Sequence, residues 1–205
     1  MRLIVIFLVL AGAGIITWLV LARPEKAAAA PKQQAIVVSK HSEFFNSQVN
    51  NLMTDYYKIG ESLVEWDSVG STSAAASFIK ILDSTKLDEL AKDSTIYLTA
   101  LTFIENVKGE AATVMNEKSI RSQREAFNSM TDNLYQFFNT VKYDREMLYL
   151  QQCPMAFDDT QAALWLSQKP EIRNPYLGLH HPTYGKGMLS CGETKQTINH
   201  TGKND

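Results

Sequence analysis

Side chains that could bind a metal ion are concentrated near the C-terminal end of the chain. The stretch holds both cysteines of the 205-residue sequence, two methionines and two adjacent histidines: Cys153, Met155, His180, His181, Met188 and Cys191. Each cysteine has a methionine two or three residues away. Thiolate, thioether and imidazole groups are the ligands that soft or borderline ions such as Cu(I) accept. The sequence therefore predicts a Cu(I) site made by the two cysteines and the two methionines, with the histidines as auxiliary ligands.

Two local geometries would bring these sulfur atoms together. Side chains alternate along an extended chain, so Cys153 and Met155 lie on the same side if residues 152–156 are extended. A turn at residues 188–191 would let Met188 and Cys191 converge in the same way. This spacing is less specific than two Cys-x-x-Cys motifs would be.

A disulfide between Cys153 and Cys191 is the alternative use of the same residues. Outside the cytoplasm, two cysteines can pair with each other or hold a metal. Closing a loop of about 37 residues would contribute roughly 3–4 kcal/mol in the chain-entropy model. The methionines would then fill gaps in the core. Both alternatives stay open, and the two states could alternate as a redox switch.

The overall composition argues against several classes of function. Lys and Arg number 20 and Asp and Glu 22, so the net charge is −2. This balance gives no reason to expect nucleic acid as a partner. The sequence has no recognisable nucleophile elbow, glycine-rich phosphate loop or His-Glu-x-x-His helix, and we predict no enzyme activity.

The N-terminal end contains an uncharged run, residues 3–22. At about 1.5 Å per residue, a helix of this length spans roughly the 30 Å of a hydrocarbon layer. We expect a single membrane-spanning anchor there, in preference to a cleavable signal peptide, whose apolar centre is usually about 7–15 residues long. Residues 23–34, with Pro24 and Pro31, read as a linker.

Residues 35–142 show the periodicity of amphipathic helices. The first helix, about 35–67, has an apolar stripe that runs from Phe45 through Tyr56 to Trp66. A second is expected after capping residues 71–73, and a third over residues 87–115. A fourth, capped by Asn116 or Ser119, would run to Val141. Four such helices with short connections predict an antiparallel four-helix bundle.

Residues 143–195 lose this periodicity and are expected to form a loop-rich Cys/Met cap packed on the bundle. We predict two or three short strands, one of them at residues 147–150, and a short helix at residues 161–167. Trp165 and Tyr176 would form the small core of the cap. Residues 196–205 are expected to be a flexible tail. The predicted fold is therefore mainly α, a four-helix bundle with a small C-terminal cap carrying short β-strands, preceded by one N-terminal transmembrane helix.

The sequence resembles a family of small periplasmic helical domains of unknown function, found in many Bacteroidetes-type bacteria. The similarity extends from Phe45 to Ile198. The matching residues lie in the cap and the bundle: Tyr149, Cys153-Pro-Met-Ala156, Trp165-Leu-Ser167, Glu171-Ile-Arg-Asn-Pro-Tyr176, Gly178, Met188-Leu-Ser-Cys-Gly192, Tyr56-Tyr57, Leu63-Val64, Asp67 and Gln123-Arg-Glu-Ala-Phe127. Residues 179–186 depart from the family pattern and look like an insertion.

The resemblance implies a role in handling copper or related heavy metals, because the family also occurs fused to CusB-type copper-efflux adaptors. We expect an inner-membrane, single-pass protein whose soluble domain lies in the periplasm. It would bind Cu(I) or a similar soft metal for buffering or hand-over to heavy-metal efflux components. The alternative is a disulfide-stabilised interaction module of the cell envelope that holds no metal.

Overall fold

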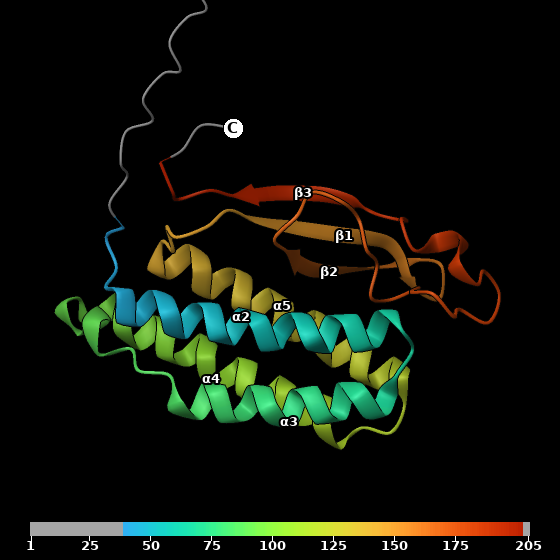
Figure 1. Cartoon of the computed structure of the whole chain (residues 1–205), viewed down its shortest axis with the longest axis horizontal. Helices are drawn as coiled ribbons and strands as arrows, with labels where there is room; N and C mark the ends of the chain where they lie inside the picture. Colours follow the sequence, from blue (N-terminus) through green and yellow to red (C-terminus); the bar gives the residue numbers. More distant parts are fainter. Residues whose placement is uncertain (1–38, 203–205) are drawn as a thin grey trace, which may run out of the picture. The chain divides into compact units, whose positions relative to one another are not determined.

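Four helices and a small sheet make up the computed structural model, which describes residues 39–202 (Figure 1). All of these residues belong to one compact unit, Val37–Asp205. The predicted anchor at residues 3–22 and the linker at residues 23–34 lie outside the described residues. Among the helices formed by residues 39–202, none is long and apolar enough to cross a membrane.

The four predicted helices are confirmed, and consecutive helices run antiparallel (Figure 1). With the labels of Figure 1, they are α2 (Glu43–Val64), α3 (Ser68–Ser84), α4 (Ser94–Asn116) and α5 (Ile120–Val141). As predicted, Ser119 stands at the N-cap of α5. The structure is therefore mainly α, and its core runs along the length of the bundle.

Side-chain caps set several helix starts that the periodicity placed wrongly. Asp67 accepts a hydrogen bond from the Gly70 N–H, so α3 begins at Ser68 and not after residues 71–73. Asp93 accepts from two backbone N–H groups and starts α4. The segment before it, expected to be helical from residue 87, forms a separate 3₁₀ helix, η1 (Asp88–Lys92).

The apolar face of the first helix is confirmed, and that of α4 is confirmed in part. Six of the seven stripe residues predicted for the first helix are buried in α2: Phe45, Val49, Leu52, Tyr56, Ile59 and Leu63. The seventh, Trp66, lies beyond the helix end at φ 60°. In α4, Ile104 and Ala111 of the expected stripe are buried, but Leu101 of the same stripe is 36 % exposed, and Ala100 is buried although the stripe did not include it. Small side chains allow α4 to approach its neighbours closely.

Three antiparallel strands form the sheet of the cap, in the order β2-β1-β3. They are β1 (Leu148–Phe157), β2 (Gln161–Ser167) and β3 (Glu193–Ile198). Two predictions are wrong here: residues 161–167 form a strand and not a helix, and residues 196–198 complete β3 and are not part of a tail. A short η2 helix, Lys186–Met188, precedes β3.

The hairpin between β1 and β2 explains the first error. Asp158 and Asp159 both have positive φ, 52° and 56°, and the Thr160 N–H donates to the Phe157 carbonyl oxygen at 3.1 Å. Positive φ at both central residues is the geometry of a type I′ turn, which favours antiparallel pairing. The sequence lacks the glycine that usually marks such a turn.

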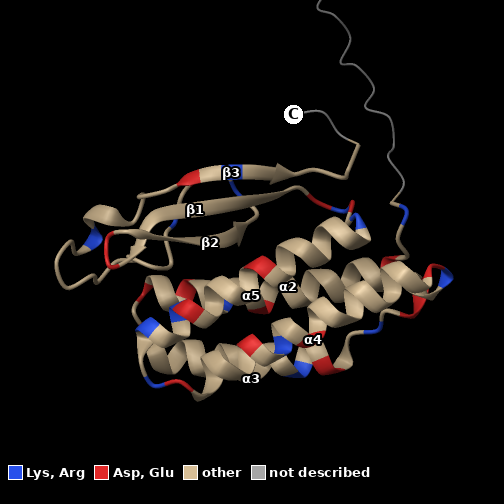
Figure 2. Cartoon of the chain, turned by 180° about the vertical axis from the view of Figure 1, so that it is seen from behind, with Lys and Arg blue, Asp and Glu red and all other residues tan. Residues whose placement is uncertain are grey.

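Side chains of the helices bond to backbone N–H groups on the outer edge of β2, the edge that pairs with no other strand within residues 39–202. In both views β2 is the strand nearest the helices, and β3 is the farthest (Figures 1 and 2). The Leu164 N–H donates to Asn128 Oδ1 at 2.7 Å, and the Leu166 N–H donates to the Tyr56 hydroxyl at 3.0 Å. Because the unpaired backbone groups of β2 bond to the bundle, this edge is covered and the cap is fixed in position.

Candidate functional site

Cys153 lies on the central strand of the cap and is fully buried. It faces Ala163 of β2 in the ladder, and the ring of Tyr176 lies close enough for the two groups to interact electrostatically. Trp165 and Tyr176 are also buried, 4 % and 1 % exposed, and their ring centroids are 6.1 Å apart. The extended geometry expected for residues 152–156 is present.

Cys191 approaches Cys153 from a turn that precedes β3. The Cys191 N–H donates to the Met188 carbonyl oxygen at 3.0 Å, so the expected turn at residues 188–191 is also present. The side chain of Cys191 lies close enough to the Cys153 thiol to raise its pKa. Both cysteines are free thiols, with Cys191 half-buried. Two sulfur-bearing segments far apart in the sequence therefore lie close together, and one of the two cysteines is only half-buried.

Asn174 fixes the turn that carries Cys191. This residue has no exposed surface, and its Nδ2 donates to the Cys191 carbonyl oxygen at 2.7 Å. Its Oδ1 accepts from the backbone N–H groups of Tyr176 and Leu177, and its own N–H donates to Leu189. The Asn174 side chain also lies close enough to Cys153 to lower the pKa of its thiol. Asn174 thus joins the turn that carries Cys191 to the backbone of Tyr176 and Leu177.

Gly192 lets the chain after Cys191 pass close to β1. Its φ is 141°, and a Cβ at this position would lie 2.7 Å from the carbonyl oxygen of Gln152. The same Cβ would meet Trp165 at 3.0 Å. Such contacts exclude any side chain without movement of the backbone, so glycine is needed for this approach.

The two methionines lie at the edge of the cap core. Met155 and Met188 are both half-buried and pack against the apolar cluster that contains Cys153. This placement is compatible with thioether ligands and also with gap-filling core residues.

The structure does not bring His180 and His181 to the thiols. His180 Nε2 lies 3.7 Å from Glu65 Oε2, and the ring of His181 makes an edge contact with Trp66 at a centroid distance of 5.5 Å. Within residues 39–202, no group of three or more His, Cys, Asp or Glu side chains is arranged to hold a metal ion. The loop of residues 179–186 therefore places both imidazoles beside the C-terminal end of α2, and their use as auxiliary ligands stays a prediction.

Burial decides the protonation state of Cys153. Removal from water raises the pKa of its thiol, and the neighbouring Cys191 raises it further. Hydrogen bonds from the Asn174 side chain and the Met155 backbone act in the opposite direction. The result is a pKa above the ordinary value for a thiol, so Cys153 is protonated at neutral pH. A metal ion that binds here has to displace this proton.

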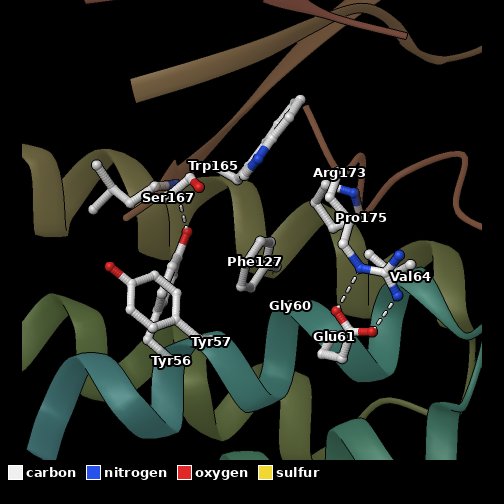
Figure 3. A pocket seen from close by; sticks show the side chains of 11 residues that line it. Tyr56, Tyr57, Gly60, Glu61, Val64, Phe127, Trp165, Ser167, Arg173 and Pro175 are labelled. Atoms are coloured by element: carbon white, nitrogen blue, oxygen red, sulfur yellow. Dashed lines mark hydrogen bonds and ion pairs between the residues drawn. The ribbon is translucent and has the colours of Figure 1, made fainter. Parts of the chain in front are cut away.

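A small pocket lies between α2 and β2, about 130 Å³ in volume. Figure 3 shows Arg173 and Glu61 facing each other at one end of it, joined by two hydrogen bonds that tie the cap to α2. Aromatic rings, among them Phe127 and Trp165, line the rest. Ligand pockets usually measure about 300–1,000 Å³, so this one is too small for a typical ligand.

The comparisons with known proteins concern the bundle and not the thiols. Residues 52–146 match a family described as Protein of unknown function (DUF3347). The match supports a domain of unknown function, and it ends before Cys153. No curated protein and no solved structure matches the chain significantly.

Proposed function

We propose that this protein binds Cu(I), or a similar soft metal ion, at the pair of thiols formed by Cys153 and Cys191. The observation that supports this most is that two free thiols lie close together, beside a fully buried asparagine that bonds to the Cys191 carbonyl oxygen. Thiolates are preferred ligands of Cu(I). Met155 and Met188 would contribute thioether sulfur from the edge of the same cap.

The accessible surface supports entry of an ion. Cys191 is half-buried whereas Cys153 is fully buried, so an incoming ion would meet Cys191 first and then displace the proton of Cys153. In the wider proposal the domain is anchored in the inner membrane through residues 3–22, faces the periplasm, and buffers the metal or passes it to an efflux component. The apolar run and the family resemblance support this wider part.

The decisive variant carries Cys153→Ser and Cys191→Ser together. We expect the reduced full-length protein to bind one Cu(I) in competition with a chelator, and the double variant to bind at least about 100-fold more weakly, because hydroxyl groups are poor ligands for Cu(I). His180→Asn is the matched control and should leave the affinity unchanged, since this exposed imidazole lies beside Glu65. Equal binding by the wild type and the double variant would refute the site.

Cu(I) affinity should rise with pH across the neutral range. The ligand is the thiolate, and the raised pKa of Cys153 means that binding releases a proton. Release of this one proton increases the affinity about tenfold per pH unit. Competition titrations near pH 6.5 and near pH 8.5, corrected for the chelator, measure the slope. Cys153→Ser should lower it, and a flat profile for the wild type would mean that Cys153 is not a ligand.

The same thiol contact also favours the second candidate, a disulfide-stabilised interaction module without metal. Oxidation by a disulfide-exchange partner would join the two sulfur atoms and remove both thiolates from metal binding. Mass spectrometry of alkylated, unreduced protein from its native compartment distinguishes the two states. Two alkylated cysteines support the metal site, and a mass two hydrogens lower, with no alkylation, supports the disulfide.

A further inference from the structure

A second cleft lies beside the first turn of α5, away from the two thiols. Its volume is about 300 Å³, within the usual range of ligand sites. Its walls come from the end of α2, the start of α5, the β1–β2 turn and the inserted loop, and they include Trp66, Arg124, Phe157, Asp159, Tyr176 and Tyr184. We call it the Arg124 cleft.

Arg124 is a buried cation with no carboxylate partner among residues 39–202. Only 4 % of its surface is exposed. Its Nε donates to the Pro175 carbonyl oxygen and its Nη2 to the Leu63 carbonyl oxygen, each at 2.8 Å. A guanidinium has five N–H groups, so after these two bonds three N–H groups are left without a hydrogen bond to the described part of the chain.

Burial of this charge has a cost that no acidic group offsets. Desolvation lowers the pKa of Arg124 to about 10, which still leaves it protonated at neutral pH. A buried charge is normally paired, because an unpaired one loses its hydration without compensation. An anion in the cleft would supply the missing partner in the bidentate geometry that arginine favours.

Aromatic side chains line the Arg124 cleft, and three of the residues that line it have uncommon backbone conformations. The Arg124 guanidinium lies 4.0 Å from the centre of the Trp66 ring. Trp66, Asp158 and Asp159 all have positive φ, and all three line the cleft. Non-glycine residues rarely adopt such backbone angles, and those that do cluster at binding sites.

The remaining charges limit what can enter. Arg121 forms two hydrogen bonds with the Asp158 carboxylate, at 2.7 and 2.8 Å, so these two charges cancel. Asp159 makes only long contacts, 3.4 Å, with the Tyr184 hydroxyl. A singly charged anion with an apolar part would pair with the Arg124 guanidinium, which has no acidic partner in the described part of the chain, and would pack against the aromatic walls. The Asp159 carboxylate would repel a multiply charged anion.

We propose that the Arg124 cleft binds a small organic carboxylate, which pairs with Arg124 and packs its apolar part against the aromatic walls. This proposal does not depend on the metal site, because it uses different residues. Asp159 further distinguishes two sources of the carboxylate. A plain carboxylic acid gains nothing from Asp159, whereas the ammonium group of an amino acid would pair with it.

Calorimetric titration of the full-length protein in mild detergent tests the proposal, with benzoate, phenylalanine, phenethylamine and inorganic phosphate as probes. We expect benzoate or phenylalanine to bind and phenethylamine and phosphate not to bind. Asp159→Asn should strengthen binding of benzoate and weaken binding of phenylalanine. Binding of phosphate or phenethylamine in preference to both carboxylates would overturn the proposal.

Two variants locate the binding without removal of the positive charge of Arg124, whose side chain also bonds to α2. Thr183→Glu places a carboxylate on an exposed wall of the cleft and should weaken carboxylate binding at least about tenfold by repulsion. Thr102→Glu, an exposed position on α4, is the matched control and should change nothing. Arg124→Lys keeps the charge but loses the planar fork, and should also weaken binding about tenfold. Equal affinities in all three variants would place any binding elsewhere.

Discussion

Replacement of Gly178 by alanine is expected to lower the free energy of unfolding by about 3 kcal/mol. Gly178 has φ +58°, a left-handed conformation that costs a residue with a Cβ roughly 1–2 kcal/mol. An alanine Cβ would also lie 2.3 Å from the Val64 carbonyl oxygen and 2.8 Å from Trp66 Nε1. These contacts force the backbone apart and break the bond from the Leu179 N–H to Val64, which joins the cap to α2.

Alanine substitutions at two nearby glycines separate the cost of a strained backbone from the cost of steric overlap. Gly185 has φ +52°, but a Cβ there meets nothing within 4 Å, so Gly185→Ala should cost only about 1 kcal/mol. Gly187 has open space and no positive φ, and Gly187→Ala should change stability by less than about 0.5 kcal/mol. Urea unfolding at a constant m-value measures all three. Equal losses for Gly178→Ala and Gly185→Ala would show that close packing on α2 is not important.

The periodicity of the sequence predicts most of the bundle because packing there follows one apolar face of each helix. It is less accurate in α4, where residues 96–103 are apolar on several sides and only tertiary contact decides which face is buried. The strand at residues 161–167 was missed for a related reason. Its residues include good helix formers, and its pairing depends on a turn at Asp158 and Asp159 that carries no glycine.

The residue types in the sequence predicted the chemistry of the candidate site, but only the fold shows where its residues lie. The spacing of Cys153 and Cys191 indicated sulfur chemistry, but their contact depends on Asn174 and Gly192, whose roles require knowledge of tertiary neighbours. The contacts of the adjacent histidines with Glu65 and Trp66 could not be predicted, because ligand type alone says nothing about the direction of a loop. The burial of Arg124 and its bond to the end of α2 were likewise visible only in the fold.

Asn174→Ala should lower the free energy of unfolding by about 3–4 kcal/mol and separate the two thiols. The substitution leaves two buried N–H groups and the Cys191 carbonyl oxygen without their partner, and each such group costs roughly 1–3 kcal/mol. Part of this cost is recovered by local rearrangement. We expect faster alkylation of Cys153 and at least about tenfold weaker Cu(I) binding, because Cys191 is no longer held in place.

Asn174→Asp tests the hydrogen bond that the Asn174 side chain donates, separately from the two that it accepts. A carboxylate can still accept from Tyr176 and Leu177, but it cannot donate to the Cys191 carbonyl oxygen. Burial favours the protonated form of the new carboxyl group, and this form can donate, so the destabilisation relative to wild type should be smaller near pH 5 than near pH 7.5. Asn106→Ala is the matched control, since this exposed side chain makes a single hydrogen bond, to Asn133.

The rate of Cys153 alkylation distinguishes two roles for Asn174. If Asn174 holds the thiols together, the fully buried Cys153 becomes reactive in Asn174→Ala under conditions where the bundle remains folded, as monitored by helical circular dichroism. If it only stabilises the cap, alkylation will increase no more than the global unfolding equilibrium requires. The second result would mean that the contact between Cys153 and Cys191 does not depend on this residue, and it would remove the main structural support for a preorganised metal site.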